Sequence, residues 1–267
     1  MEHVRVNGLD VAYRRAGSGP PIVFVHGALE DSRTWTPQLE ALQDECTVVA
    51  WDEPGAGRSD DLPPDGFTLA DYAACLAGVV DSVGLGPAHI VGLSWGSTVA
   101  LELFRRHPEV VATLILTGAY AGWKGSLPAD EVAARVAGVQ RMLDAPPEQF
   151  DPSLPGLFAG EPPASTVPLL EAMEADVRRH SMRTALSIMA ATDSSSVLPT
   201  ISVPTLLVWG ELDVRSPLRI AHEFEQAIPN ATLVVIPECG HVTNLDRPDE
   251  FNRVVREFCR RHLRSGD

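Results

Sequence analysis

The serine at position 94 stands in a setting that can make a hydroxyl group nucleophilic. It is the central residue of Gly92-Leu93-Ser94-Trp95-Gly96, which follows a short apolar run and precedes a helical pattern. A strand that turns abruptly into a helix strains the backbone at the corner, and glycines on both sides avoid a clash. The following helix presents free N–H groups and the positive end of its dipole there. This context favours Ser94 as a nucleophile over an ordinary turn residue.

Two later segments carry the groups that such a serine needs. Gly210-Glu-Leu-Asp213 and Gly240-His241 each follow an apolar run, so an acid and then a histidine come after the serine. We expect His241 to take the proton of Ser94 and to deliver it to the leaving group, while Asp213 holds the imidazole in the right tautomer. Glu211 is the alternative acid, but it lies closer to the strand end, so Asp213 is preferred.

The loop after His26 is expected to complete this machinery with backbone groups. Gly27 allows close approach, so the N–H of Ala28 can point at the same spot as the N–H of Trp95. Two such donors form an oxyanion hole, and each contributes on the order of 3 kcal/mol of transition-state stabilisation. The His26 side chain is expected to shape the loop and not to act as a base. Asp246 is expected to begin the closing helix.

The elements that must position these residues alternate between apolar strands and helices. Strands are expected at His3–Val6, Val11–Arg15, Ile22–Val25, Thr47–Trp51, His89–Val91, Val111–Leu116, Thr205–Trp209 and Thr232–Ile236. Helices are expected at Thr36–Gln43, Thr68–Val83, Trp95–Arg106, from Ser216-Pro217 onward and at Pro248–His262. This alternation predicts an α/β fold, a mostly parallel eight-stranded sheet with helices on both faces.

The alternation stops after Thr117. Residues 119–200 contain Pro-rich breaks and helix-like runs at Val132–Leu143, Val167–Arg179 and Met182–Ala191, with no convincing strand. We therefore expect a core of residues 1–118 and 201–267, and a helical cap or lid of residues 119–200. An insertion at this point covers the carboxyl edge of the strands, where α/β sheets bind their ligands.

Aromatic residues are expected to line the pocket between the core and this cap. Trp95 follows the nucleophile, and Tyr120 and Trp123 stand at the start of the cap. They predict an aromatic, largely apolar cavity. The alternative is that Tyr120 and Trp123 only pack the cap on the core.

The amino-acid composition argues against nucleic acids and membranes as partners of this chain. The 267 residues carry a formal net charge of −15, and such an acidic field repels phosphate backbones and anionic headgroups. The chain shows neither an apolar signal core nor a run of roughly 18 apolar residues. We expect a cytoplasmic protein that acts on a small molecule, with neither nucleic acid nor membrane as partner, without a metal or organic cofactor, and of open oligomeric state. The scattered Cys46, Cys75, Cys239 and Cys259 are expected to be buried free thiols.

Five motifs in chain order resemble those of the α/β-hydrolase superfamily with a helical cap. They are His26-Gly27, the Asp52-Glu-Pro-Gly-Ala-Gly-Arg-Ser59 segment, the corner at Ser94, Gly210-Glu-Leu-Asp213 and Gly240-His241. The resemblance covers nearly the whole chain and implies the α/β-hydrolase fold with a Ser94, Asp213 and His241 triad. It also implies that the segment from Asp52 to Ser59 is a structural loop.

The resemblance implies the substrate class less narrowly than it implies the fold and the triad. The corner SWGSTVAL is similar to that of the proline iminopeptidases, but His26-Gly-Ala-Leu-Glu30 stands where those enzymes carry His-Gly-Gly-Pro-Gly. Serine at the corner argues against the epoxide hydrolases and haloalkane dehalogenases, whose covalent intermediate needs a carboxylate. We expect acyl transfer on a small, largely apolar ester, lactone or thioester. An iminopeptidase-type aminopeptidase, a carbon–carbon bond hydrolase, a lyase and a small-molecule receptor on the same fold stay open.

Overall fold

The structure is a computed structural model that describes residues 1–64 and 66–262. Its strands are β1 (Glu2–Val6), β2 (Leu9–Ala16), β3 (Pro21–Val25), β4 (Thr47–Trp51), β5 (Ala88–Leu93), β6 (Val111–Thr117), β7 (Thr205–Gly210) and β8 (Ala231–Ile236). Within these residues they form one eight-stranded sheet in the order β1-β2-β4-β3-β5-β6-β7-β8. The pairs β1–β2 and β2–β4 are antiparallel and the others parallel, which confirms the predicted mostly parallel sheet.

Helices fill the connections between the strands. They are α1 (Thr36–Leu42), α2 (Leu69–Ser82), α3 (Trp95–Arg106), α4 (Ala129–Asp144), α5 (Val167–Ala175), α6 (Arg179–Ala191), α7 (Leu218–Ala227), α8 (Thr243–Asp246) and α9 (Pro248–Arg261). Short 3-10 turns are η1 (Ser32–Trp35), η2 (Pro108–Val110), η3 (Pro147–Gln149) and η4 (Ser195–Thr200). No helix in the described ranges combines the length and the apolar character that a membrane crossing requires.

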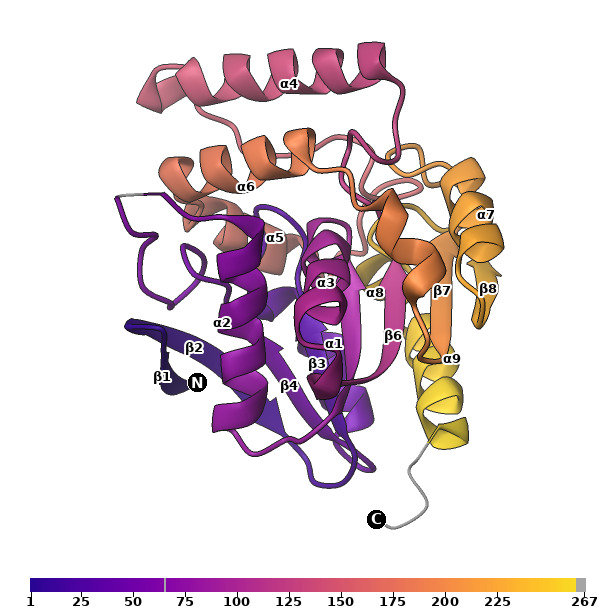
Figure 1. Cartoon of the computed structure of the whole chain (residues 1–267). Helices are drawn as coiled ribbons and strands as arrows, with labels where there is room; N and C mark the ends of the chain where they lie inside the picture. The colour runs from indigo at the N-terminus through magenta and orange to yellow at the C-terminus, as the bar shows by residue number, and fades with distance from the viewer. Residues whose placement is uncertain (65, 263–267) are drawn as a thin grey trace.

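Side chains on the central strands alternate between two hydrophobic clusters. In β3, Val23 and Val25 belong to the cluster that includes α2, α3 and α7. Ile22 and Phe24 belong to the cluster that includes α1, α8 and α9. Figure 1 shows α2 and α3 together on one face of the sheet. The sheet is therefore buried on both faces, as the apolar strands predict.

Local signals determine the ends of several elements. Asn7 and Gly8, which join β1 to β2, have φ of 51° and 87°, the positive values that a tight hairpin turn requires. Thr68 caps α2 in a capping box with Asp71, and Pro248 is the first residue of α9. The four cysteines are buried free thiols, as expected.

The break between α5 and α6 corrects the helix expected over Val167–Arg179. Helix α5 ends at Ala175, and Arg179 already begins α6. Between them Arg178 has an extended backbone, and its guanidinium donates to the carbonyl oxygens of Gly57 and Ser59 at 2.7 and 2.9 Å. This anchoring to a distant loop holds the chain out of the helix, and no local signal encodes it.

The segment between β6 and β7 lies outside the sheet. Residues 119–200 contain no strand, and α4, α5 and α6 account for its helices. Figure 1 shows α6 across the ends of α2 and α3, with α4 on its outer side. Helix α6 packs against both α3 and α4. The segment thus covers the end of α3 at which Ser94 stands.

Candidate active site

Ser94 joins β5 to α3 in a strained conformation. Its φ of 52° and ψ of −111° lie in a region that residues with a side chain rarely occupy. The N–H of Ser94 donates to the carbonyl oxygen of Thr117 at 3.0 Å, which ties the corner to β6. The strain is therefore maintained by the neighbouring strand and by the helix that follows.

The two glycines around Ser94 are required by close backbone packing. A Cβ atom on Gly92 would lie 2.7 Å from the carbonyl oxygen of Gly96. A Cβ atom on Gly96 would collide with the carbonyl oxygens of Val25 and His26. These contacts explain why both outer positions of the G-x-S-x-G motif are glycine, since only glycine leaves room for the tight corner.

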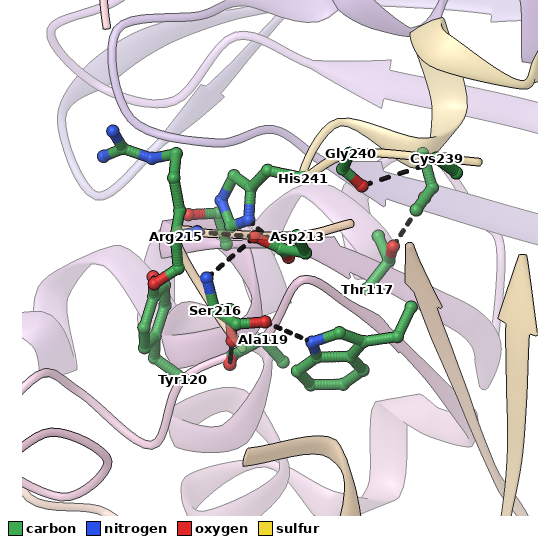
Figure 2. Close-up of polar contacts among 12 residues, drawn as sticks. Thr117, Ala119, Tyr120, Asp213, Arg215, Ser216, Cys239, Gly240 and His241 are labelled. Atoms are coloured by element: carbon green, nitrogen blue, oxygen red, sulfur yellow. Dashed lines mark hydrogen bonds and ion pairs between the residues drawn. The ribbon is translucent and has the colours of Figure 1, made fainter. Parts of the chain in front are cut away.

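Asp213 and His241 meet at the carboxyl ends of β7 and β8. Asp213 Oδ2 lies 2.8 Å from His241 Nδ1, and the two side chains are 0% and 2% exposed. Asp213 Oδ1 accepts the backbone N–H groups of Arg215 and Ser216, both at 2.8 Å (Figure 2). The carboxylate is thus held by the loop and places the proton of the imidazole on Nδ1. His241 Nε2 is buried and has no hydrogen-bond partner among the residues that the structure describes.

Gly118 makes room for this imidazole. It follows β6, has φ of 49°, and approaches the ring so closely that a Cβ atom would lie 2.9 Å from His241 Cε1 and Nδ1. A side chain here would displace the ring and would also strain the backbone. No sequence pattern indicates this role, because it depends on the packing of two distant loops.

The alternative residues take structural positions. Glu211 is exposed, and its Oε2 accepts the N–H of Glu238 at 3.0 Å. Asp246 closes α8 and does not begin α9, which corrects the sequence-based expectation. Its Oδ2 accepts the N–H groups of Gly240 and Ala159 at 2.7 and 3.0 Å, so it fixes the loop just before the site histidine.

His26 shapes the loop at the end of β3. Its Nδ1 donates to the carbonyl oxygen of Gly27 at 2.8 Å, and its Nε2 accepts the N–H of Glu53 at 3.1 Å. An imidazole that donates with one nitrogen and accepts with the other is neutral and fully engaged. It is therefore not available as a base for Ser94.

The loop after His26 leaves the expected oxyanion donors free. The N–H groups of Ala28 and Trp95 take part in none of the turn, loop or cap hydrogen bonds within residues 1–64 and 66–262. Leu29 has φ of 69°, and Glu30 Oε2 accepts the N–H of Gly27 at 3.0 Å, which closes the loop on itself. Glu30 thereby takes the donor next to Ala28 and leaves the N–H of Ala28 for another acceptor.

A cavity of about 540 Å³ brings these groups together. Ser94, His241, Ala28, Trp95, Tyr120 and Trp123 all line it. The other lining residues are Gly27, Glu30, Leu93, Val139, Leu154, Leu157, Leu186, Met189, Arg215 and Val242. The inserted segment thus supplies much of an apolar wall facing the strand ends.

Tyr120 is part of the cavity wall, and its hydroxyl also holds the loop after Asp213 by a hydrogen bond. Its hydroxyl donates to the carbonyl oxygen of Arg215, and Arg135 Nη2 donates to the same oxygen at 2.7 Å. Its backbone is held on α3, where Thr98 Oγ1 donates to its carbonyl oxygen at 3.1 Å. Burial raises the pKa of Tyr120 to about 12, so the phenol stays neutral at ordinary pH.

Two buried carboxyls beside the site were not anticipated as site residues. Burial raises the pKa of Glu30 and of Glu53 to about 7. Glu53 accepts the indole N–H of Trp95 at 2.7 Å and therefore holds that side chain in the core. Glu30 also lines a second cavity of about 390 Å³ against α5 and α6. The position of Glu30 and Glu53 beside the site depends on how the loops pack in the folded protein, so no sequence pattern predicts it.

The segment from Asp52 to Ser59 is a loop that the carboxylate of Asp52 holds together. Asp52 Oδ1 and Oδ2 accept the N–H groups of Ser32 and Arg58 at 2.8 and 2.7 Å. Gly57 has φ of 48° and touches the carboxylate of Asp52 so closely that a Cβ atom would collide with it. The motif thus braces β4 against η1 and contributes no side chain to the cavity that Ser94 lines.

Comparison with known proteins places the chain among the hydrolases of this architecture. The model of the "Alpha/beta hydrolase family" matches residues 22–254. A putative carbamate hydrolase RutD of Azorhizobium caulinodans is 30% identical over 268 residues, which cover 97% of this chain and 98% of the relative. A 2-hydroxy-6-oxononadienedioate/2-hydroxy-6-oxononatrienedioate hydrolase of Burkholderia vietnamiensis is 30% identical over 271 residues, covering 95% and 92%.

A solved structure agrees with these relatives. The thermophilic esterase of Thermogutta terrifontis superimposes with a TM-score of 0.83 at 27% identity, over 98% of this chain and 99% of that chain. With the family match over most of the length and this agreement in three dimensions, the chain is a hydrolase that belongs to the alpha/beta hydrolase family.

Proposed function

We propose that the chain cleaves a small, largely apolar ester, lactone or thioester by acyl transfer through Ser94, His241 and Asp213. The observation that carries this proposal is the state of His241. One ring nitrogen is fixed by Asp213, while the other is buried, unpartnered among the described residues and part of the cavity that Ser94 lines. An imidazole whose Nε2 is left free in a cavity that a strained serine also lines is the arrangement that general-base catalysis needs.

The reaction proceeds in two steps. His241 Nε2 takes the proton of Ser94 Oγ as the serine attacks the carbonyl carbon, and the negative oxygen binds the N–H groups of Ala28 and Trp95. The leaving group departs with the proton from His241, which leaves an acyl group on the serine. Water then gives a proton to His241 and attacks the acyl group. His241 returns this proton to Ser94 Oγ as the bond between the serine and the acyl group breaks and the acid leaves.

The wall of the cavity and the relatives support the substrate class. Leucine, valine, methionine and tryptophan side chains dominate the lining, so the acyl or alcohol part that enters is largely apolar. An esterase stands among the similar structures, and two relatives bear the names putative carbamate hydrolase and 2-hydroxy-6-oxononadienedioate/2-hydroxy-6-oxononatrienedioate hydrolase, so hydrolysis is common to all three names. We also propose that residues 119–200 act as a cap on this cavity.

Labelling with a fluorophosphonate tests the nucleophile. Wild-type protein is expected to gain one adduct in its intact mass, and Ser94→Ala none, because only an activated serine attacks phosphorus. The same pair is then compared on esters, lactones, thioesters and aminoacyl amides, where Ser94→Ala is expected to lower kcat by about 10⁴-fold or more. A well-folded wild-type protein that takes no label would overturn the acyl-transfer mechanism and favour a receptor on the same fold.

A further inference from the structure

One cation in the wall of the cavity lacks a carboxylate partner. Arg215 lines the cavity together with Ser94 and His241. Its guanidinium donates a single hydrogen bond, from Nη1 to the carbonyl oxygen of Pro155 at 3.0 Å, and forms no ion pair with a carboxylate in the described ranges. Since a guanidinium has five N–H donors, most of its hydrogen-bonding capacity is unused.

Arg215 is partly buried, and no carboxylate within the described residues neutralises it. Burial lowers the pKa of the guanidinium, yet an arginine stays charged throughout the physiological range. A partly buried charge is stabilised by an opposite charge or by several good hydrogen bonds. The protein supplies little of either to this side chain.

In contrast, the backbone of Arg215 is held firmly. Its N–H donates to Asp213 Oδ1 at 2.8 Å, and its carbonyl oxygen accepts Arg135 Nη2 at 2.7 Å and the hydroxyl of Tyr120. Figure 2 shows its side chain running from this anchored backbone, with the guanidinium directed away from Asp213. The base of the side chain is therefore fixed next to Asp213, which lowers the entropy lost when the guanidinium binds a ligand.

A carboxyl and a cation line the cavity on different loops. Glu30 contributes a carboxyl from the loop that carries Ala28, and Arg215 contributes a cation from the loop that carries Asp213. Between them the lining is mostly apolar. An uncharged substrate would leave Arg215 unpaired, whereas a substrate with a second acidic group could satisfy the guanidinium with a bidentate contact.

We propose that the site takes esters that carry a carboxylate apart from the scissile bond, and that Arg215 binds this carboxylate. This inference rests on the proposed acyl-transfer function and narrows its substrate class. Arg215 acts as a specificity residue, since it touches the substrate at a distance from the bond that breaks.

Matched ester pairs test the proposal. In the first pair the charge is on the acyl side, mono-para-nitrophenyl glutarate against para-nitrophenyl pentanoate. In the second it is on the alcohol side, para-carboxyphenyl butyrate against para-carbamoylphenyl butyrate. We expect wild type to prefer the charged member of at least one pair. Arg215→Gln should lower that ratio of kcat/KM by about 10- to 100-fold, mainly through KM.

Two further variants distinguish a direct contact between Arg215 and the substrate carboxylate from a general effect of positive charge. Arg215→Lys keeps a cation and is expected to retain part of the preference. Arg219→Gln removes a cation four residues away that is exposed and paired with Glu223, and it should leave the ratio unchanged. Fluorophosphonate labelling at Ser94 verifies that each variant has an assembled site.

A measurement on wild type alone tests the carboxylate site even where a variant does not fold. Glutarate is expected to slow fluorophosphonate labelling, and the uncharged glutaramide is not. Equal protection by both compounds, or an unchanged ratio in Arg215→Gln, would overturn the role of Arg215. If uncharged esters are then still turned over with Ser94 dependence, only this inference fails. An unlabelled wild type that hydrolyses no ester would instead refute the proposed function.

Discussion

At the scale of single residues, two carboxyls close together in sequence have opposite surroundings. Asp213 meets His241 Nδ1 and is fully withdrawn from water, whereas Glu211 is exposed and accepts the N–H of Glu238. The order of serine, acid and histidine could be predicted because each stands just after an apolar strand. Glu30 and Arg215 could not be predicted as cavity residues, since their position depends on loops that meet only in the folded protein.

The difference between the two carboxyls gives a paired prediction. Asp213→Asn should lower kcat on any substrate ester by about 10³- to 10⁴-fold, because the amide favours the wrong imidazole tautomer. Glu211→Gln should leave kcat within about twofold, since an exposed side chain is replaced. Steady-state kinetics on the two variants measures both. A silent Asp213→Asn beside a severe Glu211→Gln would show that the acid has been misassigned.

At the scale of elements, turn residues and helix caps are local signals, whereas breaks imposed by distant contacts are not. The hairpin at Asn7-Gly8 and the start of α2 at Thr68 follow from side chains within a few residues. The end of α5 follows from Arg178, which contacts a loop more than a hundred residues earlier. Asp246 likewise serves a backbone loop on its amino-terminal side. Sequence patterns predict the first kind of boundary and miss the second.

Gly118 gives a prediction at this scale, because it joins the end of β6 to the imidazole. Gly118→Ala should lower kcat by about 10- to 100-fold, since the added Cβ displaces His241. It should also lower the free energy of unfolding by about 1–2 kcal/mol through its positive φ. Gly84 is the matched control, with φ of 69° and no atom near a Cβ.

Kinetics and denaturant unfolding on the two variants separate the effects. Gly84→Ala is expected to lose similar stability and to keep its activity. If Gly118→Ala were as active as Gly84→Ala, the contact with the imidazole would have no catalytic importance.

At the scale of the whole molecule, the acidic chain encloses carboxyls that its core keeps protonated well above their usual range. Glu53 is buried under Trp95, and burial raises its pKa from 4.5 to about 7. As pH rises between these values, the unfolded chain releases this proton while the folded protein retains it. The free energy of unfolding therefore falls across that interval, by about 3 kcal/mol for this residue alone.

Glu53→Gln should remove this dependence and keep an acceptor for the indole N–H of Trp95. We expect the variant to gain stability relative to wild type as pH rises from about 4.5 to about 7, with no further gain above that range. Denaturant unfolding at several pH values measures the difference. Glu40→Gln, on the exposed face of α1, is the control that should show no such trend. A constant difference between Glu53→Gln and wild type would contradict the protonation of Glu53.

The strained corner at Ser94 also has an evolutionary consequence. A backbone at φ of 52° favours glycine, so the residue that would relax this corner best is one that has no nucleophile. With Ser94 as the proposed nucleophile, stability and activity are in direct conflict at this single position. A lineage under selection for thermal endurance alone would drift toward glycine there and become a durable, inactive binding protein. Under the proposed mechanism, selection for catalysis is what would keep a serine at this corner.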